Sequence, residues 1–160
     1  MNAITIRKAR RSDGLVLLSL INALADFEKL KRPSPAARRR LLRNGFGPGR
    51  RFEPFLAFAG DRPVGYAIIM MTYSSFLARP TLYLEDIFIL PEHRAAGIGV
   101  RLFKACLREA ERRGCGRMEW VVLDWNTNAI RFYERLGARQ LREWLPFRLE
   151  RNHFRRLLKR

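Results

Sequence analysis

Leu82–Val100, LYLEDIFILPEHRAAGIGV, is the stretch that decides the fold. Its first nine residues are mostly apolar and aromatic and predict a strand, which Pro91 ends. The glycines of Arg94–Gly99, RAAGIG, then predict a tight turn into a helix over Gly97–Arg113. No Ser, Thr, Asp or Asn caps that helix, and its free backbone N–H groups and positive dipole end suit a phosphate. The stretch lacks the Gly-Lys-Ser/Thr of a Walker A loop and the third glycine of a dinucleotide fingerprint.

The rest of the chain mixes strand and helix signals around this unit. We expect strands at residues 3–8, 55–59, 64–73, 82–90 and 117–123, helices at 12–30, 35–43, 97–113 and 126–136, and one or two final strands within 139–150. Hairpins combined with one βαβ unit predict an α/β domain with a mixed sheet. A length of 160 residues favours one domain, which we place at 1–150, followed by a basic tail at 151–160.

Two local details of the helices are also predicted. Helical spacing places the apolar stripe of the third helix at Val100, Phe103, Leu107 and Ala110. The second helix is expected to end before the glycine-rich turn at 44–49, NGFGPG.

The composition excludes several classes of protein. Hydrophobic residues make up 48% of the chain, which argues against disorder, and no apolar run approaches the ~20 residues of a membrane span. The two cysteines, Cys106 and Cys115, are too few for a disulfide framework and have no neighbouring cysteine or histidine for zinc. The N-terminus has no apolar signal core. We therefore expect a cytoplasmic protein with reduced thiols, no metal and no membrane association.

The charge is strongly positive. The chain carries 32 lysines and arginines against 15 acidic residues, a formal net charge of +17. Eight basic residues and no acidic one lie from Lys31 to Arg51, and seven basic residues lie from Arg142 to Arg160. Such runs indicate either a solvated face or a patch that binds anions such as nucleic acid or a phosphate-rich cofactor. A nucleic-acid-binding or ribosome-associated module is therefore an alternative to an enzyme.

Two motifs resemble those of a known enzyme superfamily. Tyr83–Ile89 together with Arg94–Gly99 resembles motif A of the Gcn5-related N-acetyltransferases (GNAT), whose Arg/Gln-x-x-Gly-x-Gly/Ala loop binds the pyrophosphate of acetyl-CoA. Trp125–Ala138, WNTNAIRFYERLGA, resembles motif B of the same superfamily. With Asn44–Gly47, these motifs are similar to the spermidine/spermine and thialysine acetyltransferase branch. The resemblance implies the GNAT fold, a mixed and mostly antiparallel central sheet of six to seven strands flanked by about four helices, with acetyl-CoA as cosubstrate.

The resemblance also implies which residues hold acetyl-CoA. The strand before the loop contributes backbone groups to the pantetheine arm, and the loop and the helix start bind the pyrophosphate. Two asparagines at the start of the next helix either contact the CoA arm or simply cap that helix. The expected cofactor-binding residues are Ile87, Phe88, Ile89, Arg94, Ala95, Ala96, Gly97, Ile98, Gly99, Val100, Asn126 and Asn128.

Acetyl transfer to an amine needs a base and an acid. An alkyl ammonium has a pKa near ~10.4 and must lose a proton, and Glu85 is the candidate base, directly or through water. Asp86 should point to the opposite face of the strand and is the weaker candidate. Tyr133 is the candidate acid, because a phenol can protonate the departing thiolate and the family places this tyrosine beside the CoA sulfur. Phe132 should then be a core residue.

The acceptor and the assembly follow from the resemblance alone. The positions that match acceptor-pocket residues are Phe27, Glu28, Glu85, Glu119, Trp120 and Val121. Polyamine enzymes carry an acidic residue and a tryptophan where this chain has Leu145 and Phe147, so a thialysine- or lysine-like amine is as good a candidate acceptor as a polyamine or diamine. A protein N-terminus or a ribosomal lysine stays open. Relatives of this branch pair through C-terminal strands, which implies a homodimer, and Trp144, Pro146 and Phe147 offer apolar surface there.

Overall fold

The computed structural model describes residues 3–94 and 96–159. The chain forms two compact units, Met1–Val121 and Val122–Arg160. The larger unit contains the sheet, and the smaller unit contains two helices joined by an irregular segment.

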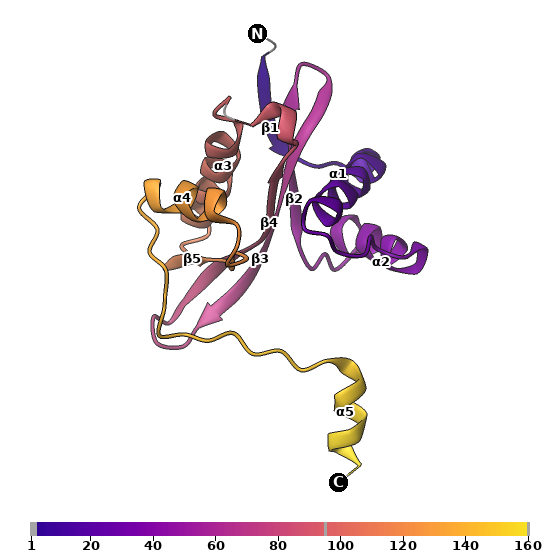
Figure 1. Ribbon diagram of the computed structural model, residues 1–160, viewed down its shortest axis with the longest axis vertical. Coiled ribbons are helices and arrows are strands. Elements are labelled where there is room, and N and C mark those ends of the chain that lie inside the picture. Colours follow the sequence, from indigo (N-terminus) through magenta and orange to yellow (C-terminus); the bar gives the residue numbers. More distant parts are fainter. Residues whose placement is uncertain (1–2, 95, 160) are drawn as a thin grey trace. The chain divides into compact units, whose positions relative to one another are not determined.

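The larger unit is built on one five-stranded sheet in the order β1-β2-β3-β4-β5 (Figure 1). Its strands are β1 (Ile4–Lys8), β2 (Glu53–Ala59), β3 (Arg62–Ser74), β4 (Arg79–Ile89) and β5 (Arg117–Glu119). The first four strands are paired antiparallel, and β5 runs parallel to β4 after a helical crossover. The mixed α/β class is confirmed, but the described residues contain five strands where six to seven were predicted.

Helices cover both faces of this sheet. α1 (Gly14–Phe27) and α2 (Pro35–Phe46) lie on one face, and α3 (Ile98–Arg112) lies on the other (Figure 1). Short 3-10 turns at Arg11–Asp13 and Pro91–His93 precede α1 and the loop that leads to α3. The sheet is therefore the middle layer of the larger unit.

α2 extends further than its sequence predicted. Ser34 caps its start by accepting a hydrogen bond from the backbone N–H three residues on, at 3.3 Å. The helix continues past Arg43 to Phe46. Gly45 is buried in this extra turn, and its bare Cα packs against Phe52, whose ring would lie 2.8 Å from an added Cβ. Close packing thus keeps the glycine in the helix, and the predicted turn begins only after it.

The two sides of the sheet bury different side chains. On the α1 side, the core cluster consists of Leu17, Leu20, Leu56, Tyr66, Ile68 and Phe88. On the other side, the stripe predicted for α3 is only partly right. Phe103 and Ala110 are buried, whereas Val100 is half-buried and Leu107 is 43% exposed. The buried face is instead centred on Leu102, Cys106 and Glu109.

α3 also buries a carboxylate that its apolar pattern did not indicate. Glu109 accepts hydrogen bonds from Arg112, from Arg113 and from Nζ of Lys8, which lies 3.1 Å from its Oε1. Arg113 and Lys8 also pair with Glu53 on β2. The hydrogen bonds, that from Arg112 above all, lower the pKa of Glu109 to about 2. This ion cluster joins α3 to β1 and β2.

The smaller unit contains α4 (Thr127–Arg135) and α5 (Arg151–Leu158). The side chain of Asn126 caps α4, which is one of the two roles considered for it, and Gly137, at φ 87°, follows the predicted end of this helix at residue 136. The residues predicted to form a basic tail are thus largely helical.

The strands predicted within 139–150 are wrong, because this described stretch has no strand. A strand needs a neighbouring strand for its hydrogen bonds, and Pro146 cannot donate one. The large apolar side chains of this stretch are exposed, with Leu145 74% and Phe147 94% accessible.

Two observations bear on the expected thiols and on the expectation that no segment crosses a membrane. Cys106 and Cys115 are both free, as predicted, and burial raises the pKa of the Cys106 thiol to about 12. Over the described ranges, no helix combines the length and the apolar composition that a membrane crossing requires.

Candidate active site

β4 has an open edge over its second half. It pairs with β5 only over 81–83, whereas its pairing with β3 continues to Ile89. In the described part of the larger unit, the backbone groups of 85–89 that face the β5 side therefore have no strand partner. Buried backbone N–H and C=O groups need hydrogen-bond partners, so this edge can accept a ligand. Of the three residues predicted to pair with the pantetheine arm, Ile87 and Ile89 face this edge, although the carbonyl of Ile89 already accepts a hydrogen bond from Arg94. The prediction is wrong for Phe88, whose backbone groups face β3, because the N–H of Leu90, two residues on, bonds to the carbonyl of Val64.

A β-bulge lies where the two candidate bases follow each other in β4. Leu84 is paired with Ile69 and Asp86 with Ile68, so Glu85 is the extra residue. The bulge breaks the simple alternation that placed Asp86 on a face away from Glu85. The expectation of opposite faces therefore loses its basis, and Glu85 as the stronger candidate base stays a prediction. Burial raises the pKa of the Tyr66 phenol, and the charges of Asp86, Glu28 and Glu85 add to this effect.

Asp86 is held by a tyrosine of the neighbouring strand. The hydroxyl of Tyr66, a fully buried residue, donates to Oδ2 of Asp86 at 3.1 Å. The pKa of Asp86 is raised to about 6: burial is the main cause, the charges of Glu85 and Glu28 add to it, and the hydrogen bond from Tyr66 opposes it. Burial also raises the pKa of Glu28, which follows the last residue of α1. Glu28, Glu85 and Asp86 form what we call the carboxylate cluster.

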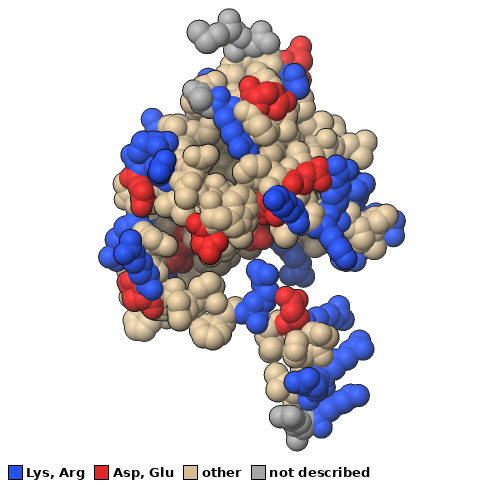
Figure 2. Space-filling view, in the orientation of Figure 1, with Lys and Arg blue, Asp and Glu red and all other residues tan. Residues whose placement is uncertain are grey.

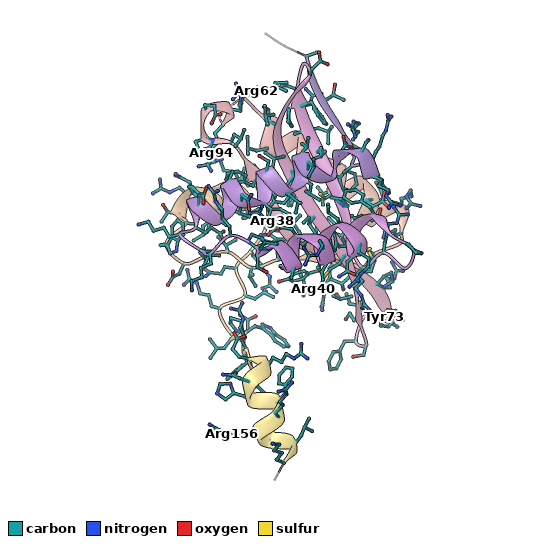
Figure 3. The ribbon with its side chains drawn as sticks, turned by 90° about the vertical axis from the view of Figure 1, so that its right-hand side faces the viewer. Arg38, Arg40, Arg62, Tyr73, Arg94 and Arg156 are labelled. Atoms are coloured by element: carbon teal, nitrogen blue, oxygen red, sulfur yellow. The ribbon has the colours of Figure 1, made fainter. Side chains whose placement is uncertain are left out.

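Aromatic rings line the same region. The ring centroids of Phe27 and Phe88 are 6.1 Å apart, and those of Phe88 and Tyr66 are 6.4 Å apart. The guanidinium of Arg94 (Figure 3) lies over the Phe27 ring, 4.5 Å from its centroid, and its Nε donates to the carbonyl of Ile89 at 3.0 Å. Arg94 was predicted to add charge beside the pyrophosphate, and here it is stacked on a residue predicted for the acceptor pocket.

The start of α3 has the geometry of an anion site. Gly97 is its N-cap residue, at φ 71°, a left-handed conformation that glycine adopts without strain. No side chain caps this end, so none occupies the first-turn N–H groups of 98–100. A Cβ on Gly97 would meet no described atom within 4 Å. Ala96 is exposed beside it, and Ala95, also predicted for the pyrophosphate loop, lies outside the described residues.

The acceptor residues predicted on a strand over 117–123 have different surroundings, and β5 itself ends at Glu119, before Trp120 and Val121. Glu119 ends β5 and forms an ion pair with Arg117 at 3.0 Å. The Trp120 ring packs edge-on against Phe103 of α3, with centroids 5.5 Å apart. Val121 is 70% exposed. Trp120 thus has a packing role, whereas Phe27 and Glu28 lie with the carboxylate cluster.

The remaining candidates belong to the smaller unit. Tyr133 is 8% exposed, and its ring lies edge-on to that of Phe132 at 5.1 Å. Tyr133 is the more buried of the pair, so the expectation of Phe132 as the core residue is wrong. Oδ1 of Asn126 accepts from the backbone N–H of Ala129 at 3.2 Å, which is the capping role considered for it, and Asn128 is exposed.

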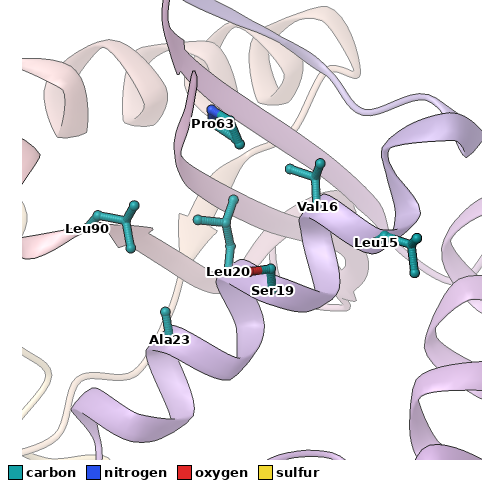
Figure 4. Close-up of a pocket in the computed structure, with 7 residues that line it drawn as sticks. All are labelled: Leu15, Val16, Ser19, Leu20, Ala23, Pro63 and Leu90. Atoms are coloured by element: carbon teal, nitrogen blue, oxygen red, sulfur yellow. The ribbon is translucent and has the colours of Figure 1, made fainter. Parts of the chain in front are cut away.

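An apolar groove runs along the first turns of α1 (Figure 4). Its volume is about 330 Å³, and its lining residues are Leu15, Val16, Ser19, Leu20, Ala23, Pro63 and Leu90. No charged side chain lines this groove, so it suits neither an ammonium group nor a pyrophosphate. The described residues also contain no group of His, Cys, Asp and Glu side chains able to hold a metal ion.

Basic side chains are prominent on the surface around α2 and on α5 (Figure 2). In α2, Arg39, Arg40 and Arg43 are exposed, and Nε of the half-buried Arg38 donates to the carbonyl of Pro33 at 3.0 Å. This exposure fits a solvated face and an anion-binding patch equally well.

The sequence and the fold of the chain are similar to those of known acetyltransferases. Residues 18–138 match the model of the acetyltransferase (GNAT) family. The chain is 36% identical over 168 residues to the thialysine N-epsilon-acetyltransferase of Mus musculus, with 98% of each protein covered. It is 45% identical over 85 residues to an L-ornithine N5-acetyltransferase of Arabidopsis thaliana, covering 53% of this chain and 37% of that protein. An integron cassette protein of V. cholerae has the same fold, with a TM-score of 0.81 and 23% identity over 98% of both chains. The chain therefore belongs to the GNAT family of acetyltransferases.

Proposed function

We propose that this acetyltransferase moves the acetyl group of acetyl-CoA to a primary amine of a small molecule by direct attack. The observation that carries the proposal is the succession of features along β4 and into α3. The carboxylate cluster suits an ammonium group, the open edge over 85–89 can pair with an amide-bearing arm, and the uncapped helix start favours a pyrophosphate. These three chemistries are the ones that an amine and acetyl-CoA present.

Glu85 and Tyr133 are the proposed base and acid. The ammonium form of an alkyl amine, with a pKa near ~10.4, predominates at neutral pH and cannot attack. Glu85 accepts its proton directly or through water, and the freed lone pair attacks the thioester carbonyl. A backbone N–H on the open edge of β4 stabilises the oxyanion, and Tyr133 protonates the departing thiolate of CoA.

The proposed acceptor is an amino acid whose side chain ends in a primary amine, of the thialysine or lysine type. One relative is named for thialysine and another for L-ornithine, and both compounds are amino acids of this kind. Leu145 and Phe147, where polyamine enzymes carry an acidic residue and a tryptophan, give no negative charge for a second ammonium group. A polyamine or diamine is the alternative acceptor.

The active protein is proposed to be a homodimer that pairs through the segment around 144–147. Trp144 is 71% and Phe147 94% exposed, and exposed apolar side chains that lie close together favour an interface. Light scattering at micromolar concentration should give the mass of two chains. The mass of one chain would contradict the dimer.

A thermal-shift series separates the enzyme from a nucleic-acid-binding module. CoA is expected to raise the melting temperature, because a ligand at 100 times its Kd stabilises the folded state by about 2.7 kcal/mol. A short RNA in the same salt series is expected to have a small effect. A steep salt-dependent RNA effect with no CoA effect would refute the proposal and support the module.

A further inference from the structure

Tyr66 places one polar group in a core that is otherwise apolar. Its ring is fully buried beside Phe88, Ile68 and the leucines of α1. A phenylalanine would fill the same volume, so packing alone does not require the hydroxyl. A hydroxyl that leaves water needs a hydrogen-bond partner, and Asp86 provides it at 3.1 Å. The hydroxyl in turn fixes Oδ2 of Asp86.

The surroundings of Asp86 favour the uptake of a proton. The titratable and charged groups that act on it are Glu28, which directly follows α1, Tyr66 from β3 and Glu85 from β4, while Arg94 is stacked on the aromatic rings of the same region. Two of these neighbours are carboxylates, and after burial, which is the larger cause, their negative charges raise the pKa of Asp86. Tyr66 occupies Oδ2, which leaves Oδ1 of the half-buried Asp86 to take a proton.

We propose that Asp86 is the second proton acceptor of the acetyl-transfer site, that it receives the proton of the acceptor amine through Glu85, and that Tyr66 is the residue that positions it. The inference rests on the proposed function, which supplies the amine and the acetyl-CoA. Glu85 is the exposed member of the pair and meets the ammonium group, whereas Asp86 is the sheltered member.

The proton and electron balance of the step closes without another reactant. An N–H bond of the ammonium group breaks, and its proton passes to Glu85 and then to Oδ1 of Asp86. The lone pair left on nitrogen bonds to the thioester carbon, and the C–S bond breaks to give the CoA thiolate. Tyr133 protonates that thiolate and regains a proton from nitrogen as the amide forms. Asp86 releases its proton to water before the next turnover.

The test is the pH dependence of kcat/KM in Tyr66→Phe, which removes the hydroxyl and keeps the ring. Loss of one hydrogen bond to a carboxylate should move the acidic limb of the profile upward by about one pH unit. Ile68→Val is the matched control, because Ile68 is paired with Asp86 and lies in the same core cluster but has no polar group. It should leave the acidic limb in place even though it loosens the core.

Asp86→Asn is the second variant and does not depend on the folding of Tyr66→Phe. Its turnover should fall at least ~10-fold, while its Kd for acetyl-CoA stays that of the parent. Parent-like turnover of Asp86→Asn, or an unmoved acidic limb in folded Tyr66→Phe, would overturn the proposal and leave the acetyltransferase intact. A parent chain that releases no CoA with any amine would overturn both.

Discussion

A single substitution at the start of α3 tests where acetyl-CoA binds. Gly97 is the N-cap of α3 at φ 71°, and Gly114 follows the other end of the same helix at φ 64°. A Cβ on either glycine would meet no described atom within 4 Å. Gly97→Val and Gly114→Val therefore impose the same kind of backbone strain in equally open surroundings. They differ in that only Gly97 lies where we propose that the pyrophosphate binds.

The expected magnitudes follow from this geometry. A side chain in the left-handed region costs roughly 1–2 kcal/mol, so both variants should lose a similar amount of unfolding free energy. Valine at Gly97 also projects into the space that a phosphate would enter. Loss of one hydrogen bond to a charged group is worth about 1.5–3 kcal/mol, which corresponds to a ~10- to 150-fold weaker Kd.

Isothermal titration with CoA measures this difference directly, at a temperature at which urea denaturation shows both variants folded. We expect Gly114→Val to bind CoA like the parent and Gly97→Val to bind it at least ~10-fold more weakly. Equal CoA affinity in the two variants would refute the assignment of the pyrophosphate to the start of α3.

Three further predictions concern single side chains. Tyr133→Phe keeps the ring and removes the acid, so turnover should fall by ~10²–10⁴-fold with little change in acetyl-CoA affinity; near-full turnover with chemistry rate-limiting would contradict its role. Glu85→Gln should lower the rate most at neutral pH and recover partly at high pH, where free amine is abundant; a pH profile like the parent's counts against Glu85 as the base. Glu109→Gln should lower the unfolding free energy at pH 7 by about 1–3 kcal/mol, measured by urea denaturation. Because the pKa of Glu109 is lowered from 4.5 to about 2, its contribution is present above pH 4.5 and is lost as the pH falls towards 2, so parent and variant should converge there.

Local signals in the sequence located most elements of the larger unit. The helix start at Gly97 and the strand before it lie close to where periodicity and turn chemistry placed them, and the family relation followed from the same residues. Such features depend on neighbours in the chain. The cap at Asn126 and the turn at Gly137 are of the same kind.

The features that were missed depend on residues far apart in the sequence. The bulge at Glu85 exists only through the register of β4 against β3, and the bond from Tyr66 to Asp86 spans 20 residues. The ion cluster at Glu109 likewise depends on Lys8, which lies 101 residues away in the sequence. A β3–β4 hairpin register, had it been assigned, would have set Tyr66 and Asp86 on one face.

The central claim, transfer of an acetyl group to a small primary amine, is tested most directly by CoA release with a panel of amines and mass spectrometry of the products. The panel consists of thialysine, lysine, ornithine, a diamine, spermidine and a lysine peptide. The account predicts stoichiometric release of CoA and a singly acetylated side-chain amine, with kcat/KM highest for the amino acids. Release of no CoA with any of these amines, from a chain that is folded, would contradict it.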